Sequence, residues 1–165
     1  MSSAWALGNQ IILGLGEGEH GLANLRRHEE CVVNVPSPEL WQKVEVLASF
    51  TGANPVPDYK KDIFHYEKNK FSASGLTAVQ SHRVLPNRIA ECPLQIESRV
   101  VNIRTSGEGT RFAIIEVETV TVHAHECIVL DDSHINTVTW SPLIYNFRHY
   151  FGLGEELGKT FRSEV

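Results

Sequence analysis

The sequence predicts a single domain of mostly β structure with helices, an α+β fold. Two long β-branched segments, 94–103 and 112–122, are joined by the turn-forming residues 105–110, which is typical of a β-hairpin. Both segments carry apolar residues on both faces, and this favours the curved strands of a small closed barrel. No repeating βαβ order, internal repeat or linker divides the 165 residues. We therefore expect one folded unit over residues 1–165.

The N-terminal part of the chain alternates short strands with helices. The apolar run 10–15 is bounded by glycines, and the β-branched run 30–35 is stopped by a proline, so we expect both to be strands. Between them, residues 20–28 have a helical pattern that places Leu22 and Leu25 on one side and arginines toward water.

A second helix is expected from Ser37 to about Phe50. Ser37 suits the N-cap and Pro38 the first helical position, and apolar residues follow at helical spacing. Residues 51–71 are polar and contain prolines and several lysines, which predicts a long and partly irregular excursion over the surface. Loops of this length are uncommon inside a compact domain and tend to be functional or mobile.

The charge balance points away from two classes of partner. The chain has 15 Lys and Arg against 20 Asp and Glu, a formal net charge of -5, whereas affinity for nucleic acid or anionic lipid depends on clustered basic residues. No apolar run approaches the roughly 20 residues that span a bilayer, and the N-terminus lacks the basic start of a signal peptide. We expect a soluble, cytoplasmic protein that binds neither nucleic acid nor membrane.

The cysteines predict neither a disulfide framework nor a zinc knuckle. There are three, Cys31, Cys92 and Cys127, and no two of them have the CxxC spacing. We therefore expect three buried thiols.

The segment 16–21, Gly-Glu-Gly-Glu-His-Gly, fits the GxGxxG pattern of dinucleotide-binding loops. It follows an apolar strand and precedes a helix, as that motif requires. However, the carboxylates of Glu17 and Glu19 would repel a pyrophosphate, the next strand ends without an acidic residue, and no further βαβ unit follows. A flexible turn before an ordinary helix start is the preferred interpretation.

Alternating polar residues near position 125 raise the question of a metal site. An extended strand would place His123, His125 and Cys127 on one face, with further Asp and His residues in 131–134. Such a group could chelate a transition metal, yet structural zinc sites usually draw on separated pairs of ligands. We expect a solvated strand end with polar side chains and no metal.

A serine nucleophile is not indicated by the sequence. Residues 72–75, Ser-Ala-Ser-Gly, lack the first glycine of the G-x-S-x-G turn and follow a polar segment rather than a strand. Ser2, Ser3 and Thr77 are hydroxyl groups beside small residues, which suits a ligand cleft and equally the more frequent role of a helix cap.

Several segments, taken together and in this order, carry a resemblance to a known family. They are 1–8 (MSSAWALG), 23–25 (ANL), 30–37 (ECVVNVPS), 70–77 (KFSASGLT), 84–97 (VLPNRIAECPLQIE), 123–126 (HAHE) and 142–154. They span almost the whole chain, and the combination is specific although no single segment is decisive. Together they resemble the flavin reductase-like family of FMN-binding split barrels. The resemblance implies an FMN-binding split β-barrel.

The resemblance also implies a homodimer in which FMN lies in a cleft of the barrel near the subunit interface. It implies an NAD(P)H-dependent flavin reductase or a flavoprotein electron carrier, in which the protein positions the ring and the cofactor carries the hydride chemistry. The residues that match the strand lining the flavin are Ser2, Ser3, Ala4 and Trp5. The segment from His20 to Asn24 resembles the helix start that meets the phosphate, a location suited to a dianion.

Two later segments complete the implied site. The loop with Lys70 and Gly75-Leu76-Thr77 resembles the one that reaches the cofactor edge or the partner subunit. Arg148, in the aromatic segment 145–151, could contact nicotinamide phosphate or flavin, or equally a dimer interface, where Arg and aromatic residues are enriched. Core or interface packing, rather than flavin stacking, is expected of Trp5, Trp41 and Trp140.

Two features depart from the family pattern. The family has a further hairpin before the Ser-Ser strand, whereas this chain begins at Met1, and a barrel without that hairpin would leave open strand edges. The family also usually offers a hydroxyl three positions before the helix asparagine, where this chain has Gly21. His20 is the candidate replacement donor, and Glu19 would oppose a phosphate. The alternative function is therefore a split-barrel binding or structural protein that has lost productive flavin binding.

Overall fold

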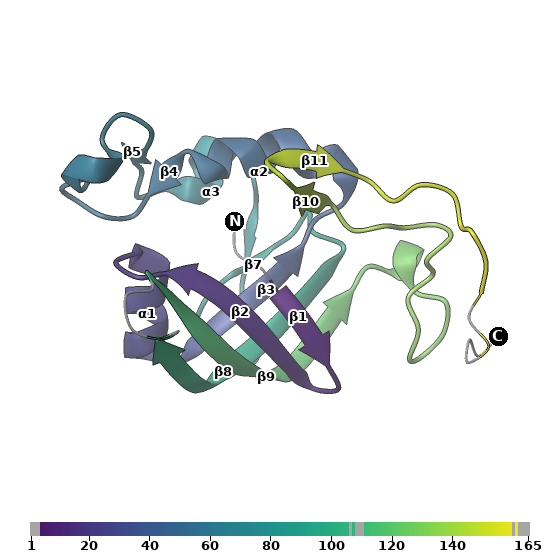
Figure 1. Cartoon of the computed structure of the whole chain (residues 1–165). Helices are drawn as coiled ribbons and strands as arrows, with labels where there is room; N and C mark the ends of the chain where they lie inside the picture. Colours follow the sequence, from purple (N-terminus) through teal and green to yellow (C-terminus); the bar gives the residue numbers. More distant parts are fainter. Residues whose placement is uncertain (1–3, 106, 108–110, 160, 162–165) are drawn as a thin grey trace.

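A five-stranded antiparallel sheet forms the centre of the computed structural model, which describes residues 4–105, 107, 111–159 and 161. The strands follow one another in the order β1-β2-β9-β8-β3 (Figure 1). Their bounds are β1 Ala4–Leu7, β2 Gln10–Gly16, β3 Glu30–Val35, β8 Leu94–Thr105 and β9 Phe112–Ala124. The predicted strands 10–15 and 30–35 and the predicted long hairpin are confirmed.

Short helices and two-stranded ribbons surround this sheet. In chain order they are α1 His20–His28, η1 Pro38–Leu40, α2 Trp41–Ala48, β4 Phe50–Thr51, η2 Asp58–Lys60, β5 His65–Tyr66, α3 Lys70–Ser74, β6 Ala78–Val79, β7 Arg88–Ile89, η3 Glu126–Ile128, β10 Ile144–Asn146 and β11 His149–Phe151. The helix predicted over 20–28 is confirmed. The second predicted helix begins as a 3-10 turn and ends two residues early, and residues 51–69 contain only short elements.

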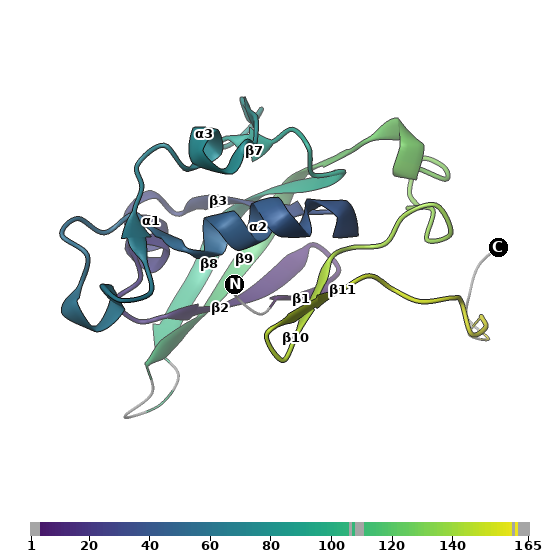
Figure 2. The ribbon, with the colours of Figure 1, turned by 90° about the horizontal axis from the view of Figure 1, so that it is seen from above.

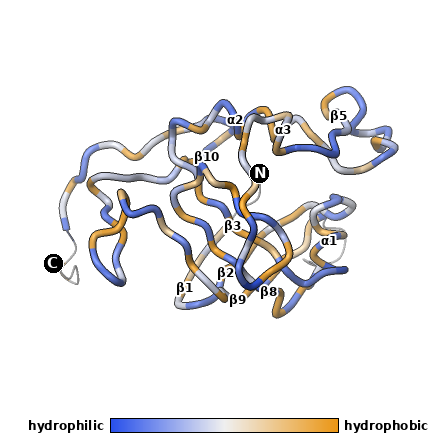
Figure 3. The backbone as a smooth tube through the Cα atoms, turned by 180° about the vertical axis from the view of Figure 1, so that it is seen from behind, coloured by the Kyte–Doolittle hydropathy of each residue, from blue (hydrophilic) through white to orange (hydrophobic). Residues whose placement is uncertain are grey.

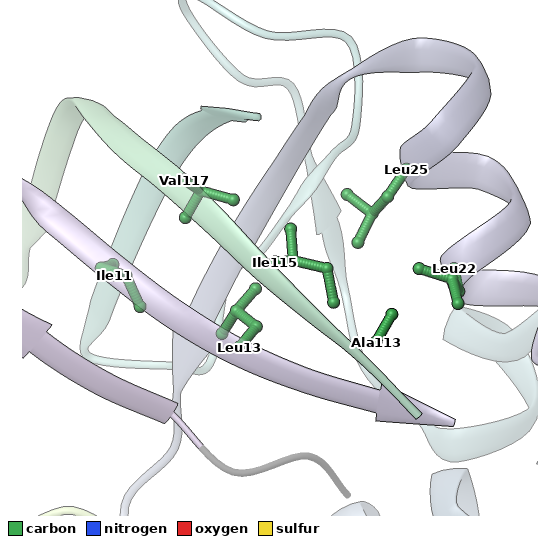
Figure 4. Packing of buried hydrophobic residues seen from close by; sticks show 7 residues of the cluster. All are labelled: Ile11, Leu13, Leu22, Leu25, Ala113, Ile115 and Val117. Atoms are coloured by element: carbon green, nitrogen blue, oxygen red, sulfur yellow. The ribbon is translucent and has the colours of Figure 1, made fainter. Parts of the chain in front are cut away.

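The main core lies between α1 and strands β2 and β9. Leu13 and Ile115 are cross-strand partners, as are Ile11 and Val117, and all four are buried. The full buried cluster consists of Ile11, Leu13, Leu22, Leu25, Ala113, Ile115 and Val117. Figure 4 shows the two α1 leucines directed toward the β9 side chains. Each fully buried Leu or Ile stabilises the fold by about 1.5–3 kcal/mol, so this cluster fixes α1 on the sheet.

The long hairpin β8–β9 is curved. Its register shifts between Glu97 and Ser98 and again between Val100 and Asn102, and such bulges bend a strand and increase its twist. Over the residues that the structure describes, β1 and β3 remain the two edges of the ladder. The predicted mostly β fold with curved strands is therefore confirmed, but the expected closure does not follow from these five strands alone.

A second layer lies over the sheet. Figures 1 and 2 show α2, α3 and the β10–β11 hairpin above it, and the segment with β4 and β5 extends from this layer over α1. The C-terminal part is attached through Trp140, whose indole Nε1 donates to Ser37 Oγ at 2.9 Å, and through Leu143, whose N–H donates to the Pro36 carbonyl at 2.8 Å. In Figure 3 the loop around β5 is largely hydrophilic, as expected of a surface excursion.

The cysteines and tryptophans differ in part from the prediction. Cys92 is buried and Cys31 half-buried, but Cys127 lies exposed in η3, so the expectation of three buried thiols is wrong there. Trp5 and Trp41 are 59% and 45% exposed, which excludes core packing for both in the single chain, and an interface role stays a prediction. Among the described helices, none has the length and apolar character needed to cross a membrane.

Candidate functional site

A hollow of about 580 Å³ lies between the start of α1, the end of β4 and the segment that leads into α3. It is lined by His20, Gly21, Asn24, Gly52, Tyr66, Glu67, Lys68 and Lys70. Figure 1 shows why these segments meet, since the excursion that carries β4 and β5 passes directly above α1. Three residues predicted for the site, His20, Asn24 and Lys70, are thus brought together from two distant parts of the sequence.

The start of α1 leaves backbone donors available. Its N-cap is Glu19, whose side chain makes no hydrogen bond to the helix and so leaves the free N–H groups of the first turn unsatisfied by the capping residue. The N-terminus of a helix also carries the positive end of the helix dipole, which favours an anion. A Cβ on Gly21 would meet nothing within 4 Å. At the position where the family usually has a hydroxyl side chain, this chain therefore leaves open space.

The backbone of Gly52 lies directly against the His20 ring. A Cβ built on Gly52 would come within 2.6 Å of His20 Cδ2, closer than real Cβ contacts allow. The parallel pairing of β4 with β5, Thr51 opposite Tyr66, holds this backbone beside the helix start. Sequence reasoning missed Gly52, because one glycine after two strand residues gives no sign of a partner 32 positions earlier.

Two lysines bring positive charge to the hollow. Lys70 Nζ donates to the Phe50 carbonyl at 3.3 Å. Desolvation lowers the pKa of Lys70, and the negative charge of Glu19 works in the opposite direction. Lys68 is exposed. The carboxylate of Glu67 is hydrogen-bonded within its own segment, because its Oε1 accepts the Asn69 N–H at 2.6 Å. The side-chain chemistry of the hollow therefore suits a phosphate or another oxyanion.

The two loop carboxylates expected to repel a phosphate both lie beside cations. Glu17 accepts two hydrogen bonds from Arg26, at 2.8 and 3.1 Å, and these bonds lower its pKa. The Glu19 carboxylate lies over Gly16, 4.0 Å from Lys60 Nζ. Their charges are therefore partly compensated before any ligand enters.

Other predicted site residues lie elsewhere. Ser2 and Ser3 fall outside the described residues. Ala4 and Trp5 lie exposed on the edge strand β1, paired with Leu13 and Ile12, and neither lines the hollow. Of the predicted flavin-lining residues, the described Ala4 and Trp5 are therefore not part of this hollow.

Thr77 has a structural partner of its own. Its N–H and its hydroxyl both donate to the Glu91 carboxylate, at 3.0 and 2.9 Å. Desolvation raises the pKa of Glu91, but these bonds outweigh it and the pKa is lowered. Thr77 therefore links the end of α3 to the segment before β8, and it does not line the hollow.

Arg148 lies at the tip of the β10–β11 hairpin. Asn146 pairs with His149, so Phe147 and Arg148 form a two-residue turn, with φ of +46° and +66°. Positive φ at both positions is typical of a type I′ turn, which normally contains Asn and Gly. Arg148 borders a separate hollow of about 350 Å³, together with Trp41 and Tyr150.

The polar residues near position 125 do not form the expected strand face. Strand β9 ends at Ala124, His125 follows it exposed, and Cys127 lies in η3. His123 instead approaches the buried Glu97, with 2.7 Å between Nε2 and Oε1. Within the described ranges, no group of three or more His, Cys, Asp or Glu is arranged to hold a metal ion.

Comparison with known proteins agrees with this architecture. The family described as flavin reductase like domain matches residues 1–154. "Uncharacterized protein YdfE" of Bacillus subtilis (strain 168) is 56% identical over 166 residues, which cover 100% of this chain and 80% of that protein.

Solved structures with the same fold are more distant in sequence. Flavoredoxin of Desulfovibrio vulgaris (Miyazaki F) has a TM-score of 0.78 at 19% identity, covering 97% of this chain and 80% of its own. A protein with a split barrel domain from Shewanella frigidimarina NCIMB 400 has a TM-score of 0.74 at 15% identity, and the match covers 98% of this chain and 76% of that protein. The fold is therefore the split barrel of these structures.

Proposed function

The chain belongs to the flavin reductase-like family, and we propose that it is a cytoplasmic oxidoreductase that binds FMN. Electrons pass from NAD(P)H to the flavin, or through the flavin to another acceptor. When bound, the flavin supplies the hydride and electron chemistry. The residues of this chain hold the cofactor in place.

The observation that carries the proposal is the meeting of His20, Asn24 and Lys70 at an uncapped helix start. Helix N–H groups and a partly desolvated ammonium provide the donors that a phosphate dianion requires. The side chains of His20 and Asn24 make no hydrogen bond to other described residues, so both are available to a ligand. These donors support FMN over riboflavin, which lacks the phosphate.

The alternative, a split barrel that has lost productive flavin binding, has less support. It rested in part on Gly21 in place of a hydroxyl and on Glu19, which would oppose a phosphate. Gly21 leaves space beside the helix amides, and the carboxylates of Glu17 and Glu19 both have cationic neighbours. Neither feature therefore blocks a phosphate.

We also propose a two-fold homodimer. Large apolar side chains are exposed on β1, on the β8–β9 hairpin and along the C-terminal segment, and monomers rarely leave such surface uncovered. They include Trp5, Leu7, Val101, Val120, Val122, Tyr145, Phe147, Phe151 and Leu153. Arg148 lies among them on the hairpin tip, which supports its predicted place at the interface or beside the cofactor.

Titration of the purified protein with FMN and with riboflavin tests the proposal. We expect FMN fluorescence to be quenched, FMN to protect against thermal unfolding, and riboflavin to bind more weakly. Asn24→Ala should weaken FMN binding about tenfold through the loss of one hydrogen bond to a charged group. Asn87→Ala, which alters another exposed amide that does not line the hollow, is the matched control and should leave FMN affinity unchanged. Absence of both quenching and protection at excess FMN would refute flavin binding.

A further inference from the structure

Glu19 occupies the position where a carboxylate opposes a phosphate most directly, the residue before the first turn of α1. As the N-cap it could have accepted hydrogen bonds from the helix amides, yet its side chain makes none of them. The carboxylate is turned back over Gly16, where an added Cβ would lie 2.9 Å from Glu19 Oε1. The carboxylate therefore lies beside Gly16 and not on the helix amides.

Lys60 is the cation that meets this carboxylate. Its Nζ lies 4.0 Å from Glu19 Oε1, and its side chain is only 16% exposed. The ammonium also lies 5.6 Å from the ring centre of Tyr59 and 5.5 Å from that of Phe64, within the range of cation–π attraction. Lys60 is thus held in place by its own segment, independently of any ligand.

The negative charge of Glu19 also affects a residue that lines the hollow. It acts on Lys70, where it raises the pKa against the effect of desolvation. A carboxylate so close to the helix start would cancel much of the attraction that the helix N-terminus and Lys70 offer to an anion. Whether the hollow accepts a dianion therefore depends on what compensates Glu19.

We propose that Lys60 is a specificity-determining residue that makes the hollow selective for the phosphorylated flavin by compensating the charge of Glu19. This inference rests on the proposed function, since it concerns recognition of the phosphate at the same site. Lys60 acts through Glu19 and does not line the hollow itself. A ligand without a phosphate gains nothing from this compensation.

A double-mutant cycle on Lys60 and Glu19 tests the proposal, with dissociation constants measured for FMN and for riboflavin. Lys60→Gln should weaken FMN about fivefold, as expected for loss of one partly exposed charge interaction, and change riboflavin by less than about twofold. Glu19→Gln in the Lys60→Gln background should restore FMN affinity, because the uncompensated charge is removed. Lys60→Arg keeps the cation and should keep the preference for FMN.

Lys61→Gln is the matched control. Lys61 carries the same charge one residue later but pairs with Asp58 rather than with Glu19, so FMN affinity should be unchanged. Equal weakening of FMN and riboflavin by Lys60→Gln would overturn the proposal, as would failure of Glu19→Gln to restore FMN in a variant with unchanged thermal unfolding. A parent protein that binds neither flavin would refute the proposed function as well. If the parent binds FMN but the cycle shows no coupling between Lys60 and Glu19, only the proposed role of Lys60 is refuted.

Discussion

His123 Nε2 lies 2.7 Å from Oε1 of Glu97, a carboxylate that has no exposed surface. The same carboxylate accepts the His82 N–H at 2.8 Å and the Arg83 N–H at 2.6 Å, and Arg88 Nε lies 3.7 Å away. One acidic side chain of β8 thus connects strand β9 with the ribbon β6–β7 and its loop. Removal of any one donor would leave a buried charge incompletely paired, which is costly.

The first prediction concerns stability in acid. Desolvation raises the pKa of Glu97, but the amides of His82 and Arg83 and the His123 ring outweigh it and lower the pKa from 4.5 to about 2. A carboxyl group whose pKa is lowered by folding stabilises the native state at pH values above the pKa that the group has in the unfolded chain. That contribution, on the order of 3 kcal/mol, is lost as the pH falls from about 4.5 toward 2.

Urea unfolding at pH 7, 5 and 3 measures this dependence. Glu97→Gln should be less stable than the parent at pH 7, and the difference should shrink as the pH falls to 3. A difference that is constant over this range would contradict the proposed role of the ionised carboxylate. Glu116→Gln is the control. It removes a half-buried carboxylate of β9 that lies 3.8 Å from Arg104 Nε, and it should change stability by less than about 1 kcal/mol.

The second prediction concerns Gly52. A methyl group at this position would displace the His20 ring, so Gly52→Ala should weaken FMN about fivefold through loss of the proposed hydrogen bond from His20 to the phosphate, and His20→Ala should have the same effect. The two effects should not add, because both remove the same interaction. Gly154→Ala, where the added Cβ meets nothing within 4 Å, should leave affinity unchanged. Additive losses would show that Gly52 acts independently of His20.

The third prediction concerns the hairpin tip. Phe147 and Arg148 adopt positive φ without being Gly or Asn, which costs roughly 1–2 kcal/mol per residue. The double substitution Phe147→Asn with Arg148→Gly should therefore raise the free energy of unfolding of the chain by about 1 kcal/mol or more. Thermal unfolding measures the gain. A lower melting temperature would mean that these side chains make stabilising contacts that exceed the backbone strain.

The fourth prediction concerns assembly. Light scattering at micromolar concentration should give twice the 18.5 kDa mass of the chain. Leu153→Asp, in the exposed C-terminal segment, should weaken the dimer. Leu85→Asp should not, although the exposed fraction of Leu85 is 82% and that of Leu153 is 61%. The monomer mass for the folded parent protein would refute the dimer. Equal effects of the two substitutions would remove the C-terminal segment from the interface.

Local pattern accounts for the parts of the fold that could be predicted. Helix 20–28 and the strands of the long hairpin are each specified by residues close in sequence, and their periodicity is enough to identify them. The pairing of Leu13 with Ile115 joins segments about 100 residues apart, and nothing in either segment alone identifies the partner. The irregular segment 51–69 has no periodicity, so its path over α1 could not be predicted.

The same division applies to the site. His20, Asn24 and Lys70 were identified through resemblance to a family, and the structure brings them to one hollow. Gly52 and Lys60 were missed, because their importance comes from a contact with the helix start rather than from a motif. Thr77 was expected to lie in a loop that reaches the cofactor edge or the partner subunit, and within the described residues its hydroxyl donates to Glu91, 14 residues later. A hydrogen bond between two loops leaves no trace in local sequence.

The unequal burial of the three cysteines makes the chain suitable for selective covalent labelling. Desolvation raises the pKa of Cys31 to about 11, and desolvation together with the charge of Glu91 raises that of Cys92 to about 12, so almost no reactive thiolate forms at either at neutral pH. Cys127 is exposed in η3. A maleimide spin label should therefore attach at Cys127 alone, and in a two-fold dimer pulsed electron resonance would report a single distance between subunits without any engineered cysteine.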